Sequence, residues 1–384
     1  MSVADASGSW RFRGQAIQRS PRSAEILLGR LGRLLGQKPE KELLYVVPDA
    51  NWITDWIGHY VTAGVEARHG LPGRLMTPSA VRGQFGKIVH FTSLWEFATA
   101  ADTPLVCDND AVATVFHGSL DAENPLLRQG IERLVENAHK LKRLLTASTM
   151  MMERFSAWGL PDGLCSCIPL GIDLDVFRPV SAEKRQHLRL RYGIPEEAIC
   201  IGSFQKDGDG WGEGNSPKMI KGPDIFLDVL AKLVKHAPLF VLLSAPARGY
   251  VKRGLERLNI PYRHEIVGDY QSVAEMYGCL DLYLMASREE GGPSSVLESL
   301  ACGVHFVGSI TGLAPDVITH DLNGLLVEAG NADALARQVA RLIDAPELRA
   351  RLAAEGLKTI QPYDWPLIAD RYYNEIYAPL IQSR

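Results

Sequence analysis

Short apolar runs alternate with longer amphipathic helical patterns along almost the whole chain. Four runs lie in the first half, at residues 43–47, 87–91, 111–116 and 143–147, and five follow at residues 198–204, 239–244, 263–267, 280–286 and 304–308. Helical patterns separate them, for example at residues 57–68 and 125–141. This alternation is typical of parallel α/β sheets, and it argues against a β-sandwich or a helical bundle.

The chain length and one internal segment indicate two domains. A chain of 384 residues exceeds the roughly 100–200 residues of an ordinary domain. Residues 168–179, IPLGIDLDVFRP, place two prolines around a glycine, which suits an ordered connector. We therefore expect one Rossmann-like domain at residues 1–179, with a C-terminal helix at 365–384 packing back on it, and a second at residues 180–364. Two such doubly wound domains would face each other across a cleft, with ligands beyond the carboxyl ends of the strands.

Charge is distributed unevenly along the chain. The net charge of −4 gives no general attraction for nucleic acid. The first 42 residues differ, because eight lysines and arginines oppose four acids there, and apolar residues recur at helical spacing over residues 26–35. Two interpretations remain open: a helix lying on an anionic membrane surface, or a helix packed on its own domain with solvated arginines.

The expected location is the cytoplasm. No apolar run approaches the roughly 18 residues of a membrane span, and the N-terminus lacks the apolar core of a signal peptide. Peripheral contact with the inner face of the membrane through residues 1–40 is a hypothesis that follows from the basic N-terminus.

The segment QKDGDGWGEG, residues 205–214, holds four glycines at alternate positions after an apolar run. It fails the G-x-G-x-x-G pattern, since Glu213 or Asn215 falls where the third glycine belongs. It also fails the P-loop and calcium-loop patterns, in part because Lys218 lies at positions that require other residues. The segment is therefore expected to be a mobile, solvated loop, and the lysines at its margins, Lys206 and Lys221, are better candidates for holding phosphate than its glycines.

The segment SREEGGPSSVLESLACG, residues 287–303, is the most informative one. It follows an apolar run, turns at Gly291 and Gly292, and starts a helix at Pro293 with Ser294 and Ser295 in the first turn. Free N–H groups and the positive end of that helix form an anion site.

Two carboxylates flank this anion site, Glu290 in the loop before the helix and Glu298 farther along it. A sugar hydroxyl is a natural donor to such a carboxylate, so the pattern suggests a sugar nucleotide. The alternative, in which Glu290 is a loop acid and Glu298 a surface helix residue, is equally compatible with the spacing.

The motif EGGPSSVLESLACG resembles the Glu-x7-Glu motif of retaining glycosyltransferases of family 4, which have the GT-B fold. Other stretches agree in order and spacing: residues 168–179 resemble the IPNGID-type linker of the family, 114–118 its strand-ending histidine segment, 221–222 its Lys-Gly pair, and 312–316 and 323–327 its G-x-x-P-E and NGLLV segments. The resemblance covers roughly residues 110–380, and the first 100 residues match weakly.

The resemblance implies a role for each matching residue. Glu290 would contact hydroxyls of the donor sugar, Glu298 the ribose, Lys221 the diphosphate, and His117 the transferred sugar from the other domain. The diphosphate would lie against Gly291, Gly292 and the amides of Ser294 and Ser295. One departure concerns the arginine that the family commonly carries after its first strand of the second domain: Ser203 stands there, and Lys206 is the candidate replacement.

The implied function is a retaining, metal-independent glycosyltransferase acting in polysaccharide, lipopolysaccharide or other glycoconjugate biosynthesis. It would move a sugar from a UDP- or GDP-sugar to a hydroxyl of a glycan or a lipid-linked acceptor, with no cofactor besides the donor. Asp-x-Asp pairs occur at residues 108/110, 173/175 and 207/209, but so short a pattern is weak evidence for a metal. A GT-B epimerase and a non-catalytic sugar-nucleotide-binding subunit are the alternatives, and a nicotinamide-dependent dehydrogenase is least favoured because the glycine pattern fails.

Overall fold

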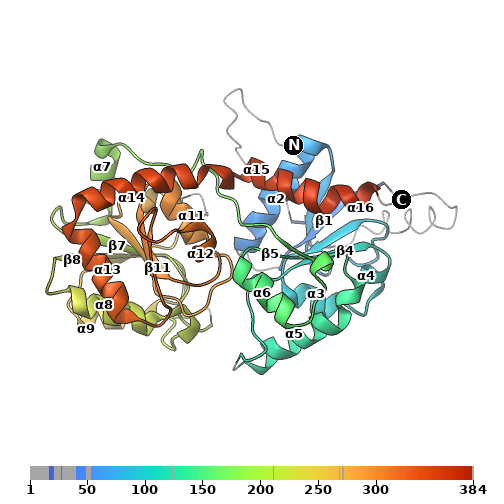
Figure 1. Ribbon diagram of the computed structural model, residues 1–384, viewed down its shortest axis with the longest axis horizontal. Coiled ribbons are helices and arrows are strands. Elements are labelled where there is room, and N and C mark those ends of the chain that lie inside the picture. Colours follow the sequence, from blue (N-terminus) through green and yellow to red (C-terminus); the bar gives the residue numbers. More distant parts are fainter. Residues whose placement is uncertain are drawn as a thin grey trace. The chain divides into compact units, whose positions relative to one another are not determined.

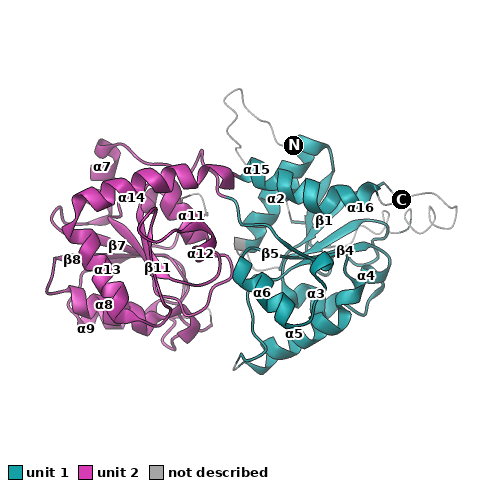
Figure 2. Ribbon diagram, in the orientation of Figure 1, with its two compact units in different colours: residues 1–171, 365–384 teal, residues 172–364 magenta. Residues whose placement is uncertain are grey.

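The computed structural model describes residues 17–20, 27, 40–48, 53–122, 124–210, 212–267, 269 and 272–382. It divides the chain into two compact units (Figure 2): unit 1, residues 1–171 and 365–384, and unit 2, residues 172–364. The division falls inside the connector at residues 168–179, whereas the sequence suggested a boundary at its end. Apart from residue 27, the helix predicted at residues 26–35 lies outside the described residues.

Unit 1 contains a six-stranded parallel sheet in the order β2-β1-β3-β4-β5-β6 (Figure 1). Its strands are β1 Leu43–Val46, β2 Gly73–Met76, β3 Ile88–Phe91, β4 Asp110–Thr114, β5 Arg143–Thr146 and β6 Cys165–Cys167. Its helices are α2 Ile53–His69, α3 Leu94–Ala100, α4 Pro104–Cys107, α5 Pro125–Asn137, α6 Thr149–Ala157, α15 Trp365–Arg371 and α16 Ala378–Gln382, the last two joined by a π-helical turn at Tyr372–Tyr377.

The C-terminal segment belongs to unit 1 because its side chains contact side chains of α2 and the backbone of β6. The rings of Tyr60 in α2 and Trp365 in α15 stack with centroids 4.9 Å apart. Arg371 donates to the carbonyl oxygen of Cys167 at 3.0 Å, and Asp370 accepts from Arg68 at 2.7 Å. The chain therefore returns to the first unit after it has formed the second.

Unit 2 contains a second six-stranded parallel sheet in the order β12-β11-β10-β7-β8-β9. Its strands are β7 Ile199–Ser203, β8 Leu239–Leu243, β9 Tyr262–His264, β10 Leu282–Met285, β11 His305–Ser309 and β12 Leu325–Val327. Its helices are α7 Ala182–Tyr192, α8 Pro223–Leu233, α9 Gly249–Arg257, α10 Val273–Tyr277, α11 Ser294–Ala301, α12 Ala314–Val317, α13 Ala332–Asp344 and α14 Pro346–Thr359.

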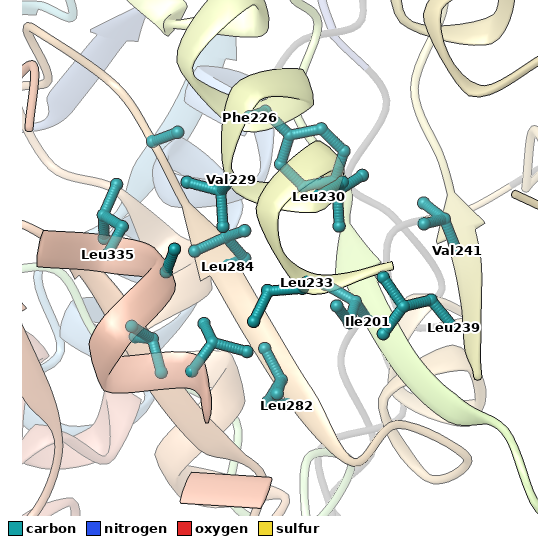
Figure 3. Packing of buried hydrophobic residues seen from close by; sticks show 14 of the residues in the cluster. Ile201, Phe226, Val229, Leu230, Leu233, Leu239, Val241, Leu282, Leu284 and Leu335 are labelled. Atoms are coloured by element: carbon teal, nitrogen blue, oxygen red, sulfur yellow. The ribbon is translucent and has the colours of Figure 1, made fainter. Parts of the chain in front are cut away.

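Both faces of the second sheet are buried, which explains its nearly continuous apolar strands. On one face, Leu282 and Leu284 pack with Leu230 of α8 and Leu335 of α13 in one apolar cluster (Figure 3). The strand residue between the two leucines, Tyr283, points to the opposite face, where its ring stacks on that of Phe306 at 6.3 Å. The parallel α/β architecture predicted from the alternating pattern is thus confirmed.

Three strands were not predicted, β2, β6 and β12, and each lies at an edge of its sheet. Edge strands are short and need not be apolar on both faces, so they give a weak sequence signal. None of the helices in the described part of the chain has the length and hydropathy that a membrane span requires.

Candidate functional site

The candidate site lies where the strand order of unit 2 reverses. From β7 the chain proceeds to β8 and β9 on one side, and it then returns to β10, the other neighbour of β7. Loops that leave β7 and β10 at their carboxyl ends therefore diverge next to each other, which is the position where open α/β sheets bind ligands. The two segments singled out from the sequence, residues 205–214 with Lys221 beyond its end and residues 287–303, follow these two strands.

An ion pair joins the two segments. The ammonium of Lys221 lies 2.6 Å from Oε2 of Glu290, and the two side chains are 22% and 10% exposed. The hydroxyl of Ser287 lies 2.8 Å from Oε1 of Glu290 and 3.1 Å from Oε1 of Gln205. Gln205 in turn donates to the carbonyl oxygen of Lys221 at 2.8 Å. Since both Glu290 oxygens have partners, the carboxylate and the ammonium are held in one fixed arrangement.

Gly222 lets the Lys221 turn approach the end of β10. Its φ is +62°, and a Cβ at this position would lie 1.9 Å from the carbonyl oxygen of Ala286. Only a residue without a side chain allows both the left-handed backbone and this contact. The glycine of the Lys-Gly pair therefore places the lysine beside the Glu290 loop.

Arg288 ties the Lys221 turn to the same loop. Its guanidinium forms two hydrogen bonds with the Asp224 carboxylate at 2.8 and 2.6 Å, and it donates to the carbonyl oxygen of Met219 at 2.8 Å. The backbone N–H groups of Arg288 and Glu289 donate to the carbonyl oxygen of Ile220. A bidentate pair of this kind adds geometric definition to its energy.

Helix α11 begins beside Glu290 with the residues predicted for an anion site. Gly291 and Gly292 separate Glu290 from Pro293, and Ser294 and Ser295 form the first turn, which has no side-chain cap. The first N–H groups of a helix lack intrahelical acceptors and carry the positive end of its dipole. This end of α11 is suited to bind a phosphate.

Glu298 lies in α11 and is buried, with only 4% of the residue exposed. Its Oε2 accepts a hydrogen bond of 2.6 Å from the hydroxyl of Tyr277, which is itself fully buried. The alternative of a solvated surface residue is therefore wrong for Glu298. A buried carboxylate needs hydrogen-bond donors, and Tyr277 is one that the sequence did not reveal.

Three lysines gather at the site. Burial lowers the pKa of the Lys218 ammonium, and the neighbouring charges of Lys221 and Lys206 lower it further. The predicted residues Lys206 and Lys221 are thus brought together, and Lys218 joins them. The sequence missed Lys218 because it was considered only as a mismatch to two loop patterns.

The glycine-rich segment is exposed at residues 209, 210, 212 and 213, as expected of a solvated loop, and backbone hydrogen bonds hold its two ends. Gly208 pairs with Pro217 as in an antiparallel bridge, and the hairpin continues through backbone hydrogen bonds to the start of α9. Gly214 has a φ of +72°, and a Cβ there would lie 2.1 Å from the carbonyl oxygen of Ala247. This glycine thus allows close packing of two backbone segments. Trp211 lies outside the described residues.

Ser203 ends β7, at the position where the resemblance implies an arginine, and Arg248 from another loop reaches it. Arg248, between β8 and α9, donates to the Ser203 carbonyl oxygen at 2.6 Å and to its hydroxyl at 3.0 Å. Its Nη2 also lies 3.0 Å from Oδ2 of Asp207, and both side chains are essentially unexposed. This arginine carries its charge inside the domain.

His117 belongs to unit 1, where it follows β4 with an exposed side chain. Among the residues that the structure describes, no group of three or more histidine, cysteine, aspartate or glutamate side chains is arranged to hold a metal ion. In the Asp-x-Asp pair at 207/209, Asp207 is paired with Arg248.

A family model matches part of the chain. Residues 215–359 match the family model of glycosyl transferases group 1. The matched segment contains Lys218, Lys221, Glu290 and Glu298, whereas Lys206 and His117 precede it. The glycosyl transferase match therefore covers most of the predicted site and much of unit 2.

Curated relatives are similar over longer stretches. A D-inositol 3-phosphate glycosyltransferase of Xylanimonas cellulosilytica is 27% identical over 304 residues, which cover 76% of this chain and 70% of the relative. A GDP-mannose-dependent monoacylated alpha-(1-6)-phosphatidylinositol monomannoside mannosyltransferase of Corynebacterium glutamicum is 25% identical over 54% of each chain. Two further D-inositol 3-phosphate glycosyltransferases are matched over 63% and 61% of their lengths. The family match and these names support the expectation that the chain is a transferase.

Solved structures confirm the fold. The Anabaena protein Alr3699/HepE in complex with UDP and glucose has a TM-score of 0.72 at 16% identity, covering 88% of this chain and all of that one. The sucrose-phosphate synthase of Thermosynechococcus elongatus has a TM-score of 0.65 at 15% identity, covering 97% of both chains. The predicted GT-B class, with two Rossmann-like units, is thus confirmed.

Proposed function

We propose that the protein is a retaining, metal-independent glycosyltransferase that moves a sugar from a nucleotide-sugar donor to an acceptor hydroxyl. The observation that carries this proposal is the contact between Lys221 and Glu290 at the switch point of unit 2, next to the start of α11. A cation and helix N–H groups attract phosphate, while a carboxylate accepts hydrogen bonds from sugar hydroxyls. A nucleoside diphosphate sugar offers both kinds of group on adjoining atoms.

In this proposal the site stabilises the departing nucleoside diphosphate. As the bond between the sugar carbon and the phosphate oxygen breaks, negative charge grows on that oxygen, where Lys221 and the α11 amides of Ser294 and Ser295 would attract it. Preorganised positive groups of this kind do the electrostatic work that a metal ion does in other transferases. Glu290 would hold hydroxyls of the sugar, and Glu298 those of the ribose.

The retaining course needs no protein nucleophile. The acceptor oxygen would bond to the sugar carbon on the face that the phosphate leaves, and the acceptor proton would pass to the departing phosphate oxygen. The acceptor oxygen supplies the electron pair of the new bond, and the phosphate oxygen keeps the electron pair of the bond that breaks. His117 is proposed, from the resemblance alone, to contact the transferred sugar.

The relatives guide the choice of donor and acceptor. We propose a UDP- or GDP-sugar as the donor, since the name of the Corynebacterium relative specifies GDP-mannose and the Anabaena structure holds UDP. The acceptor is proposed to be a glycan or a lipid-linked molecule, in line with the phosphatidylinositol mannoside in the name of the former. Action in glycoconjugate biosynthesis in the cytoplasm, with residues 1–40 at the inner membrane face, completes the proposal.

The decisive experiment screens donors and then acceptors. Thermal unfolding is followed with UDP-, GDP-, ADP- and dTDP-sugars, because a ligand that binds the folded state raises the melting temperature. The stabilising donor is then incubated with EDTA and with acceptors that include inositol phosphate, phosphatidylinositol and oligosaccharides. The anomeric configuration of the product is read by NMR.

Each outcome of this screen decides between the candidate functions. Transfer in EDTA with an unchanged anomeric configuration supports the proposal. An inverted product contradicts retention, and a new sugar nucleotide formed from donor alone indicates an epimerase. Binding of donor without transfer to any acceptor of the panel favours a non-catalytic subunit.

A further inference from the structure

The glycine-rich hairpin, residues 205–218, is anchored from inside the domain by a buried ion pair. Asp207 and Arg248 lie 3.0 Å apart between Oδ2 and Nη2, with 1% and 0% of their side chains exposed. Arg248 is held in turn by the carbonyl oxygens of Ser203, at 2.6 Å, and Ser244, at 2.9 Å. These acceptors come from the ends of two adjacent strands, β7 and β8, so the guanidinium is fixed to the sheet itself.

A buried charge pair needs a reason, because removing two charges from water costs free energy that their attraction only partly returns. Burial raises the pKa of the Asp207 carboxyl, and the charge of Arg248 opposes that shift. Apolar packing would anchor a loop at a lower desolvation cost. The pair does, however, set the position of one backbone segment, because Asp207 can meet the fixed guanidinium in only a narrow range of places.

The residues positioned by this pair are lysines of the candidate site. Lys206 directly precedes Asp207, and the N–H of Lys218 donates to the carbonyl oxygen of Asp207 at 2.8 Å. The carbonyl oxygen of Lys218 then accepts from the N–H of Lys221 at 2.8 Å. One chain of hydrogen bonds therefore runs from the buried pair through Lys218 to Lys221.

We propose that Lys218 is a third cation for the diphosphate of the donor, and that Asp207 and Arg248 are positioning residues that hold it there. The inference rests on the proposed function. The charged groups acting on Lys218 are Lys221, Lys206, Glu290 and Asp209. Lys218 therefore lies within electrostatic reach of Lys206 and Lys221, the two lysines proposed to hold phosphate.

The arrangement also accounts for the serine at position 203. An arginine there would extend from the end of β7, where Arg248 already occupies the space against the Ser203 hydroxyl. The small residue admits the buried guanidinium. The positive charge at the site thus comes from lysines of the hairpin, and the hairpin is attached to the sheet through the ion pair of Asp207 with Arg248.

The test compares the binding of UDP and GDP with that of uridine and guanosine, by calorimetry on the full-length protein. Lys218→Gln should weaken binding of the diphosphate on the order of tenfold, which corresponds to about 1.4 kcal/mol, and leave the nucleoside unaffected. Lys218→Arg should restore much of the loss. Lys235→Gln, which removes an exposed lysine of the same unit, is the matched control and should bind as the wild type does.

The positioning role is tested by a double-mutant cycle. Asp207→Asn keeps the size of the side chain and should weaken diphosphate binding in the same direction. Combined with Lys218→Gln it should add little, because one residue acts through the other. A purely structural role would instead lower thermal stability without changing the ratio of diphosphate to nucleoside affinity.

The failure of this inference is distinguishable from that of the proposed function. If the wild type binds UDP or GDP and Lys218→Gln binds it equally well, Lys218 is no ligand of the diphosphate and the inference is overturned. Fully additive losses in the double variant overturn the positioning role. If the wild type binds neither nucleotide, the donor site itself is refuted, and the inference with it.

Discussion

The ammonium of Lys221 and the carboxylate of Glu290 are 2.6 Å apart although 69 positions separate them in the chain. In the proposed reaction each has its own task, the lysine on the phosphate and the glutamate on the sugar. Their contact also fixes the position of the ammonium relative to the carboxylate. The phosphate bound by one and the sugar bound by the other would therefore be held in a defined relative position.

Lys221→Ala should lower kcat/KM by about 10²–10³-fold, the range for removing one preorganised group that stabilises developing charge. The fall should appear mainly in kcat, since the charge grows as the bond breaks. Steady-state kinetics with the stabilising donor measures this, and circular dichroism checks the fold. Lys235→Ala is the control. A Lys221→Ala enzyme with wild-type kcat would remove this lysine from the mechanism.

Glu298 and Tyr277 allow the proposed ribose contact to be separated from stability. Tyr277→Phe removes one donor to a buried carboxylate, which should lower the free energy of unfolding by about 1–3 kcal/mol and leave ribose recognition in place. Glu298→Gln should instead reduce discrimination between UDP or GDP and its 2′,3′-dideoxy analogue, which we expect to be about tenfold in the wild type, because a neutral amide oxygen accepts a weaker hydrogen bond than a carboxylate. Competition binding with both analogues provides the measurement.

The result that would contradict this assignment is simple to recognise. If the wild type binds both analogues equally, or if Glu298→Gln keeps their difference, Glu298 does not bind the ribose. Its burial against Tyr277 would then be structural.

The sequence predicted the interior of each sheet well and its margins poorly. Apolar runs such as residues 239–244 correspond closely to buried strands, here Leu239–Leu243, because both faces of a parallel sheet are covered. Edge strands such as Cys165–Cys167 are half-buried and short, so no apolar pattern marked them. Local sequence thus reports burial that extends over several residues, and β6 has three residues that are only half-buried.

The sequence indicated those parts of the candidate site that lie within one continuous segment, and it did not indicate the contacts between distant segments. Glu290 and the start of α11 form one continuous motif, which a single segment can reveal. The pairing of Asp207 with Arg248 joins residues that meet only after β7 and β8 have aligned. The pattern of glycines around Asp207 indicated flexibility, yet close backbone packing uses the same residue type.

Gly222→Ala tests whether the position of the Lys221 turn depends on glycine. The added Cβ would meet the Ala286 carbonyl oxygen at 1.9 Å with a φ of +62°. Left-handed backbone costs about 1–2 kcal/mol for an alanine, and overpacking adds about 1–3 kcal/mol. We expect lower thermal stability together with weaker donor binding, measured by calorimetry.

Gly212→Ala is the matched control for that variant, because a Cβ at residue 212 meets no atom within 4 Å. It should change the free energy of unfolding by no more than about 0.5 kcal/mol. Equal effects of the two substitutions would show that the contact of Gly222 with Ala286 does not determine the position of the turn.

His90 is a residue of unit 1 that should make the stability of the protein depend on pH. It is fully buried in β3, with Nδ1 2.7 Å from the Tyr377 hydroxyl and Nε2 2.7 Å from the Thr114 hydroxyl. Burial lowers its pKa from 6.5 to about 3. The folded protein therefore keeps this imidazole neutral at pH values where an unfolded chain would protonate it.

Between pH 6.5 and about 3 the unfolded chain binds a proton at His90 that the folded chain does not. Stability must then fall as the pH falls, by up to about 1.4 kcal/mol per pH unit from this group. His90→Gln should flatten the dependence between pH 6.5 and 5, where few carboxylates titrate, although its stability at pH 7.5 is lower. Urea unfolding across this range measures the slope. His139→Gln, at an exposed histidine of the same unit, should keep the wild-type slope, and an unchanged slope in His90→Gln would refute the role of His90.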